Sequence, residues 1–194
     1  MGRVELDTAL RLQRRIVFDK GEQDDGSVTL LLCEHQRSIS IGRGGSRAQI
    51  RLSEEELRGR GLELHFIARG GGCIPHAPGQ LAIYPLVSLE RKGWSVGEFW
   101  QRLQIGLCDA LDEMRIPMTT RKGRIGLWGR SGQLAAGGFA VRHGVTHHGA
   151  FVNVEVPRDI FGYVDTIPPA NAIAGEKTTR GSLVSEKGRP VRMA

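Results

Sequence analysis

Hydrophobic and polar positions follow a helical period in two long segments of the chain. Apolar residues recur three or four positions apart over residues 6–17, which predicts an amphipathic helix near the start. The same spacing returns over residues 99–114 and predicts the longest helix, with its apolar side toward a core and its end before Pro117. Capping boxes at residues 53–56 and 95–98 predict where a short helix and this long helix begin.

Short apolar runs between and after these segments have the length of strands. Residues 28–33 are apolar almost without interruption, which predicts a strand buried on both faces. Further strands and one helical turn, at 159–161, are expected; the strands fall at 62–68, 81–86, 125–128, 133–138, 139–146 and 150–156. No repeat or linker interrupts the chain, so residues 1–194 are predicted to form a single α+β domain. Residues 183–194 are expected to form a loose tail.

Composition agrees with an ordinary globular protein. The 194 residues are 40% hydrophobic and 25% charged, which provides for a packed core and argues against a disordered chain. No apolar run reaches the roughly 18 residues of a membrane-spanning helix, and the first seven residues lack the apolar segment of a signal peptide. Cys33, Cys73 and Cys108 lie far apart without a CxxC pair, which argues against a disulfide framework and predicts a cytoplasmic location.

The charge balance favours acidic partners. The net charge is +6, but the excess is spread along the chain and aromatic residues make up only 6% of it. Nucleic-acid binding modules usually combine a basic patch with stacking aromatics, and no such motif is present. We therefore expect an acidic protein partner, or a role of the charge in solubility, rather than nucleic acid.

Three segments carry the candidate chemistry. Residues 69–80 (RGGGCIPHAPGQ) follow a strand directly, and their glycines allow a backbone to press against a ligand, although a glycine-rich hairpin without a ligand has the same pattern. Residues 133–138 (QLAAGG) leave room for an acyl chain beside a strand, or for close packing of a helix on a sheet. Residues 146–153 (THHGAFVN) place polar side chains inside a strand pattern, which indicates a cleft or a satisfied hydrogen bond in the core.

Two other kinds of site are disfavoured. His143, His147 and His148 suggest a metal, with the first two on one face of a strand, but no acidic residue is close and no HExxH pattern exists, so no metal site is predicted. Residues 40–52 resemble the start of a forkhead-associated phosphothreonine-binding domain. A capped helix follows them instead of that family's second loop with serine and histidine, which argues against this interpretation.

Over residues 5–183 the sequence resembles the octanoyltransferases of lipoate biosynthesis, in the biotin/lipoate protein ligase superfamily. The matching motifs occur in the family's order at residues 32–35 with 42–43, 69–80, 84–85, 126–128, 133–138, 146–153 and 167–171. One such match is weak evidence, whereas a full series in order is specific.

The resemblance implies a fold, a reaction and partners. The fold would have a central mixed β-sheet flanked by helices. The reaction would move an octanoyl group from acyl carrier protein to a lysine of a lipoyl domain, through a cysteine thioester supported by a lysine and without a cofactor. The residues that it implies for acyl binding are expected to converge on one cleft; they are Arg69, Gly70, Gly71, Gly72, Cys73, Ile74, Pro75, His76, Ala136, Gly137, Gly138, Gly149, Ala150 and Phe151.

The sequence departs from the family at the two reactive positions. Ala170 stands where the family has its nucleophilic cysteine, and Gln133 stands where it has the lysine. Alanine cannot attack a thioester, and glutamine carries no charge to stabilise a thiolate. No catalytic residue of the usual pair is therefore intact.

Two functions remain open at this point. In one, the transferase activity survives through another residue, for which Cys73 near Arg69 and His76 is the candidate; a buried spectator thiol is the alternative for Cys73. In the other, which the residues favour, the chain is a non-catalytic relative that binds an acyl chain or a lipoyl domain. A basic face is expected to meet the acidic partners; its candidate residues are Arg43, Arg47, Arg69, Arg121, Lys122 and Arg124.

Overall fold

The computed structural model describes residues 1–23, 26–121, 125–165 and 179–191. Runs of up to three strands are separated by helices along the chain, which fits the α+β prediction. The elements are β1 (Arg3–Val4), α1 (Leu6–Glu22), β2 (Thr29–His35), β3 (Ser38–Ile41), η1 (Arg47–Gln49), α2 (Glu54–Gly59), β4 (Glu63–Phe66), β5 (Cys73–His76), β6 (Gln80–Leu86), α3 (Leu89–Lys92), α4 (Val96–Glu113), β7 (Gly126–Gly129), β8 (Gly132–Arg142), β9 (Val145–Asn153), η2 (Arg158–Tyr163) and α5 (Leu183–Lys187).

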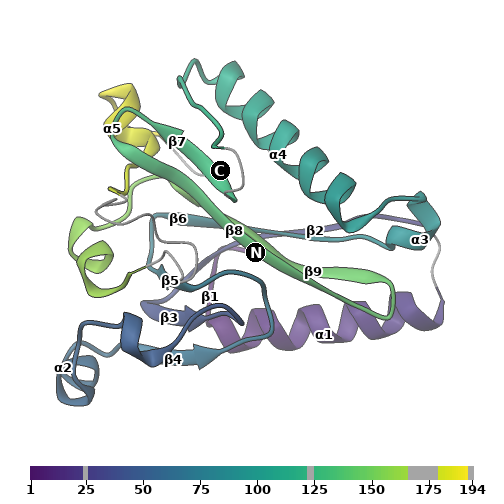
Figure 1. The fold of residues 1–194 in the computed structure, drawn as a ribbon, viewed down its shortest axis with the longest axis horizontal. Coiled ribbons are helices and arrows are strands. Elements are labelled where there is room, and N and C mark those ends of the chain that lie inside the picture. Colours follow the sequence, from purple (N-terminus) through teal and green to yellow (C-terminus); the bar gives the residue numbers. More distant parts are fainter. Residues whose placement is uncertain (24–25, 122–124, 166–178, 192–194) are drawn as a thin grey trace.

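The central layer is a mixed β-sheet (Figure 1). Within the described residues it has six strands in the order β1-β2-β6-β9-β8-β7. β1 runs parallel to β2, and the other neighbours are antiparallel. The expected α+β fold with a central mixed sheet flanked by helices is confirmed.

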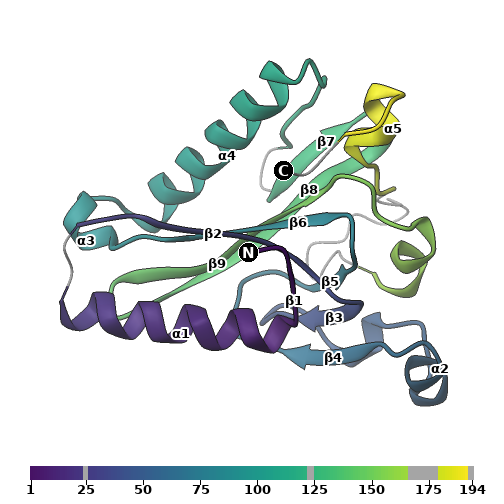
Figure 2. The same cartoon turned by 180° about the vertical axis from the view of Figure 1, so that it is seen from behind.

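Helices lie on opposite faces of this sheet (Figures 1 and 2). On one face α1 packs Ala9 and Val17 against Cys33, Tyr84 and Phe151. On the other face, Leu111 of α4 and Leu183 of α5 join a second cluster with residues of β7, β8 and β9. Among the described residues, no helix is long and apolar enough to cross a membrane.

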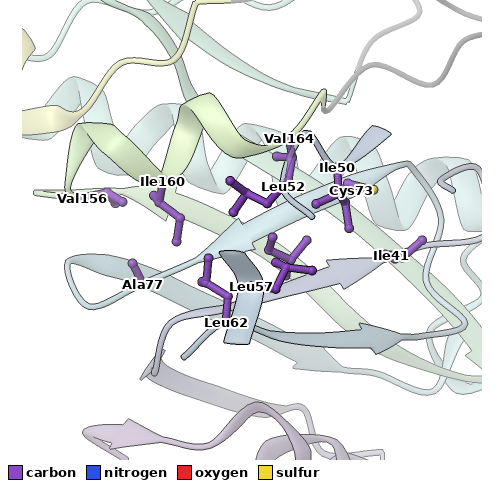
Figure 3. Close-up of a cluster of buried hydrophobic side chains, with 11 residues drawn as sticks. Ile41, Ile50, Leu52, Leu57, Leu62, Cys73, Ala77, Val156, Ile160 and Val164 are labelled. Carbon is purple, nitrogen blue, oxygen red and sulfur yellow. The ribbon is translucent and has the colours of Figure 1, made fainter. Parts of the chain in front are cut away.

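A small second sheet holds the glycine-rich segment. Within the described chain it has the order β4-β3-β5, with β3 parallel to β4 and antiparallel to β5. Figure 3 shows its aliphatic core, in which side chains of these strands meet others from η2 and from the residues around α2. This sheet positions Arg69 and His76 next to the central sheet.

Both predicted capping boxes are present. Ser53 and Glu56 exchange backbone and side-chain hydrogen bonds at the start of α2, and Ser95 and Glu98 do the same at the start of α4. α4 ends at Glu113, ahead of Pro117. The expectation that its apolar side faces a core holds in part: Phe99 and Leu111 are the buried residues of the helix. Between α4 and the sheet lies a cavity of about 460 Å³ lined by apolar residues.

The expectation that residues 28–33 form a strand buried on both faces is wrong for one face. β2 forms there, but Leu30 and Leu32 are 53% and 42% exposed. Cys33, which directly follows Leu32, is buried in the cluster under α1. Alternate residues of a strand point to opposite faces, and the face that carries Leu32 borders the open cavity beneath α4.

The expected boundary between strands 133–138 and 139–146 is also wrong. β8 is one strand of 11 residues, and the turn to β9 comes later, at His143 and Gly144. Gly138 lies inside this strand, and a Cβ at this position would collide with the carbonyl group of Gly70. His143 therefore lies in a turn with φ of 51°, not on a strand face with His147.

The loose tail expected from residue 183 is contradicted for Leu183–Lys187, which form α5. The hydroxyl of Ser182 accepts a hydrogen bond from the backbone N–H of Ser185, and Leu183 is buried. The surrounding sequence is mostly polar, but the buried side chain of Leu183 is enough to hold this short helix on the sheet. Residues 192–194 lie outside the described chain.

Candidate functional site

Three segments singled out in the sequence lie against one another. The backbone N–H of Gly70 donates to the carbonyl oxygen of Phe139 in β8 at 3.0 Å. In the antiparallel pair of β8 and β9, Gly138 lies opposite Gly149, and Ala136 lies opposite Phe151. The loop of Arg69–Gly72, the small residues of β8 and the start of the apolar part of β9 are thus neighbours in space.

Arg69 is the largest fully buried side chain of the site. Its Nη2 donates to the carbonyl and hydroxyl oxygens of Ser40 at 2.9 and 2.8 Å, and its Nη1 donates to the carbonyl of Gly70 at 2.9 Å. Burial lowers the pKa of Arg69 to about 10. Its Nε has no partner among the described residues. Arg69 thus fixes the glycine loop to β3 through neutral acceptors.

A buried chain of hydrogen bonds continues from Ser40. The Ser40 hydroxyl lies 2.7 Å from His76 Nε2, and His76 Nδ1 lies 3.0 Å from Gln80 Oε1. Because this amide oxygen can only accept, Nδ1 of His76 carries the proton. Burial, with smaller contributions from His35 and Arg69, holds the pKa of His76 well below its usual value, so the ring is neutral.

The chain of hydrogen bonds then crosses to the far end of the site. Gln80 Nε2 donates to Asn153 Oδ1 at 3.1 Å. The amide nitrogen of Asn153 donates at 3.1 Å to the carbonyl oxygens of Gln133 and of Gly181. We call Arg69, Ser40, His76, Gln80 and Asn153 the buried polar chain. It connects the glycine loop with the backbone at Gln133.

At Gln133 the hydrogen bonds to other described residues are made by the backbone groups. Its N–H donates to the carbonyl of Thr179 at 2.9 Å, and its carbonyl accepts from Gly181 at 3.1 Å. The side chain is 8% exposed and its Nε2 lies over Gly126, where a Cβ would come within 2.7 Å of it. Ala170, the other reactive position, lies outside the described residues.

A second buried pair adjoins the polar chain. His35 Nε2 lies 2.5 Å from the Tyr84 hydroxyl, and its ring meets that of His76 edge-on, with centroids 5.7 Å apart. The His76 ring also packs on Phe151 at 4.6 Å. Burial lowers the pKa of His35 and raises that of Tyr84. These aromatic groups therefore fill the space beside the polar chain in their neutral forms.

The segment expected to bind the acyl group divides between two environments. Arg69–Gly72 lie against β8, whereas Cys73, Ile74, Pro75 and His76 form β5 of the small sheet. Cys73 is fully buried in that sheet's core (Figure 3), with Sγ 3.5 Å from the carbonyl oxygen of Ser46. Burial raises the pKa of its thiol.

The residues expected to bind the acyl group did not include Ser40, Gln80 or Asn153, which carry the buried polar chain. Gln80 and Asn153 end the candidate segments 69–80 and 146–153, and a satisfied hydrogen bond in the core was one alternative for the second segment. A signal existed for Ser40, because it is a polar residue between two isoleucines of a short strand. Gln80 and Asn153 lie far apart in sequence but are paired in register between β6 and β9. Their juxtaposition follows from strand pairing, which no local pattern reveals.

Two cavities lie elsewhere. One is the space beneath α4; the other, of about 340 Å³, lies between α1 and the β8–β9 turn. None of the residues expected to bind the acyl group is among the described residues that line either cavity. In the described part of the chain, no three His, Cys, Asp or Glu side chains are arranged to hold a metal ion.

Comparison with known proteins bears on this arrangement. The family model described as the lipoyl protein ligase A/B catalytic domain matches residues 6–188. An octanoyltransferase of Geotalea uraniireducens is 31% identical over 193 residues, which are 100% of this chain and 84% of that protein. An octanoyltransferase of Porphyromonas gingivalis is 32% identical over 174 residues, which are 84% of this chain but 35% of that protein. This chain thus spans about a third of the length of the second relative.

A solved structure shows the same fold. The crystal structure of P. falciparum LipL1 in complex with lipoate has a TM-score of 0.74 and covers 94% of this chain and 54% of that one. The sequence identity is 14%, so the likeness concerns the fold.

Proposed function

Because the chain belongs to the family of lipoyl protein ligase A/B catalytic domains, we propose that it serves protein lipoylation as a non-catalytic relative. In this role it binds an octanoyl or lipoyl group, or the lipoyl domain that carries it, and does not transfer the group through a thioester. Acyl carrier protein and lipoyl domains as partners, and the cytoplasmic location, stay predictions.

The neutral side chain at residue 133 carries this proposal. Gln133 stands where the octanoyltransferases have their lysine, and it offers no charge to a thiolate or a developing oxyanion. Arg180 pairs with Gln133 in an isolated bridge. Its guanidinium, however, donates to the carbonyl oxygens of Phe161 and Val164 at 2.6 and 3.3 Å. Because these hydrogen bonds hold it there, it does not replace the charge of the family's lysine.

The thiols of the chain support the same proposal. Ala170 supplies no nucleophile. Burial raises the pKa of Cys33 to about 11, and burial also raises the pKa of Cys73 and Cys108. A thiolate is the reactive form, so all three are poor nucleophiles at neutral pH. Removal of the nucleophile from a covalent mechanism lowers the rate on the order of a million-fold.

The rest of the site supports binding. The buried polar chain holds the loop Arg69–Gly72 against β8, and Gly138 lets the two backbones approach. These are the segments that the resemblance assigns to the acyl group. A site that has lost its reactive pair while retaining this framework fits a binding role.

The basic face is revised by burial. Arg69 is fully buried and cannot meet a partner, and Arg47 already pairs with Glu54 at 3.0 Å. Arg43 is exposed and stays a candidate, as does Arg121, while Lys122 and Arg124 lie outside the described residues. A smaller basic face still steers acidic partners, with an attraction that salt screens.

The test is an incubation of the full chain with octanoyl acyl carrier protein and an apo lipoyl domain, followed by intact-mass measurement. We expect no octanoylated lipoyl domain and no adduct on the chain, together with salt-sensitive binding of one of the two partners in a separate pull-down. An adduct on the wild-type chain that Cys73→Ser abolishes and Cys33→Ser retains would make it an enzyme with a relocated nucleophile. Absence of binding to both partners would contradict the binding role.

A further inference from the structure

The cavity between α1 and the β8–β9 turn has a basic rim and no acidic one. Its volume is about 340 Å³. Arg14 projects from α1, and Arg142 and His143 come from the end of β8 and the turn. The described residues that line it include neither aspartate nor glutamate; they are Leu10, Gln13, Arg14, Val17, Phe18, Ile67, Ala68, Arg142, His143, His147 and His148.

The inner wall holds an unused hydrogen-bond donor. Gln13 is 1% exposed, and its Oε1 accepts the backbone N–H of His148 at 2.7 Å. Its Nε2 is buried and has no partner in the described part of the chain. Buried donors are almost always paired, with protein, water or a ligand. An orphaned amide in the wall of a cavity therefore points to a bound acceptor.

The backbone at this wall is in an unusual conformation. His148 lies within β9 yet has φ of 61°, in the left-handed region that residues with a Cβ rarely adopt. Its ring is 5% exposed and lies 4.4 Å from the ring of His147, between centroids. Strained positions of this kind persist where the surrounding structure holds them, and they cluster at binding sites.

The charged groups that shift the pKa values of His147 and His148 are all positive. Arg14, Arg43 and Arg142 form no ion pair with any described residue. Burial first, and then Arg142 and Arg43, lower the pKa of His147. Burial, His147, Arg69, Arg14 and Arg43 lower the pKa of His148 to about 3. The cavity thus has an uncompensated positive potential, which an anion would neutralise.

From this combination we propose that the cavity binds a small organic anion, in which a phosphate or carboxylate group is joined to a short apolar portion. The oxyanion would pair with Arg14 and Arg142 at the rim, within reach of the free amide donor of Gln13. The apolar portion would lie on Leu10, Val17 and Ile67, on the remaining wall. No residue of the buried polar chain is among the described residues that line this cavity, although Ala68 precedes Arg69 and His147 and His148 belong to the segment 146–153. The proposed lipoylation role does not require the anion.

Anion binding is linked to protonation at this site. The groups that face His147 are Arg142 and His143 from β8 and its turn, Arg14 and Gln13 from α1, Arg43 from the loop after β3, and His148 beside it. A bound anion stabilises the imidazolium form and raises its pKa. Binding of an anion whose own charge stays constant, such as a carboxylate, therefore takes up a proton, and its affinity rises as the pH falls from 8 to 6.

The experiment is calorimetric titration of the full chain with inorganic phosphate, n-butyl phosphate and pentanoate at low ionic strength. We expect saturable binding of both organic anions, with n-butyl phosphate tighter than inorganic phosphate by about threefold or more. Arg142→Gln should weaken binding by about tenfold, and Gln13→Leu should weaken it as well. Proton uptake is measured with pentanoate, which stays ionised between pH 8 and 6, and should appear as a dependence of the binding heat on the buffer.

Arg11→Gln is the matched control, because Arg11 is on the same helix, bonds to Thr8 and does not line the cavity. It should change affinity by less than about twofold. Equal weakening by Arg11→Gln and Arg142→Gln would show unspecific attraction and overturn the proposal. So would a lack of saturation by either organic anion, or affinity for pentanoate that does not rise as the pH falls. Since no partner protein takes part, failure here leaves the lipoylation proposal untouched.

Discussion

The two ends of the candidate site differ in which atoms hold them together. At the arginine end, side chains do so: Arg69, Ser40 and His76 bond to one another or to β3 and β5 in the interior. At the glutamine end, the contacts are made by backbone atoms of Gln133, with Thr179 and Gly181. The framework therefore depends on side chains other than those at the two positions that the resemblance assigns to the reaction. We expect it to tolerate exchanges at those two positions.

Of the substitutions that test this difference between the two ends, one at Arg69 is expected to have the largest effect. Arg69→Met removes the donors to Ser40 and Gly70 and leaves buried oxygens unpaired. We expect the free energy of unfolding to fall by about 3–5 kcal/mol. Urea denaturation followed by circular dichroism measures it. Arg43→Met, on the exposed neighbouring loop, is the control and should stay within about 0.5 kcal/mol of wild type; similar losses in both would remove the distinction.

A second test uses pH at His76. Its folded pKa lies below its unfolded value of about 6.5, so the unfolded chain gains a proton that the folded chain does not. The stability this gives is present above pH 6.5 and is lost as the pH falls toward the folded pKa. His76 should contribute up to about 1.4 kcal/mol per pH unit between pH 6.5 and 5.

In His76→Phe that part of the slope should disappear, while His148, with a folded pKa of about 3, continues to contribute. Urea midpoints at pH 7.5, 6.5 and 5.5 give the slopes for both chains. His143→Gln, in the β8–β9 turn, serves as the control. A slope that is unchanged in His76→Phe would mean that His76 is charged in the folded protein.

The smallest effect is expected at the glutamine end. Gln133→Met keeps the side-chain volume, and the hydrogen bonds recorded at this residue come from its backbone. The free energy of unfolding should change by less than about 1 kcal/mol, as measured by the same denaturation. A loss as large as that of Arg69→Met would show that the Gln133 side chain belongs to the framework.

Local sequence signals were sufficient for the starts of α2 and α4. The expectation that the three small-residue segments lie together came from the family resemblance. The capping boxes at Ser53 and Ser95 specify their helices through contacts within four residues. The glycines of residues 69–72 were expected to press against a ligand, and residues 133–138 to leave room for an acyl chain or for close packing. In the structure Gly70 and Gly138 approach each other instead. Both kinds of signal are local, or depend only on the absence of a Cβ.

Other features depend on partners distant in the chain. Leu32 is exposed on the side of the cavity beneath α4, which no pattern in β2 could indicate. The turn between β8 and β9, at His143 and Gly144, was likewise not placed correctly from the local pattern. The bond between Gln80 and Asn153 joins residues 73 positions apart, so it becomes visible only with the strand order.

The central claim is that the framework is retained and the thioester chemistry is lost. The direct test is intact-mass measurement of octanoyl adducts after incubation with octanoyl acyl carrier protein, for the wild type, Ala170→Cys, and Ala170→Cys with Gln133→Lys. We predict no adduct on the wild type, a small amount on the single variant, whose thiol keeps a pKa near about 8.5, and the largest amount on the double variant. An adduct on the wild-type chain, or none on a folded double variant, would contradict this account.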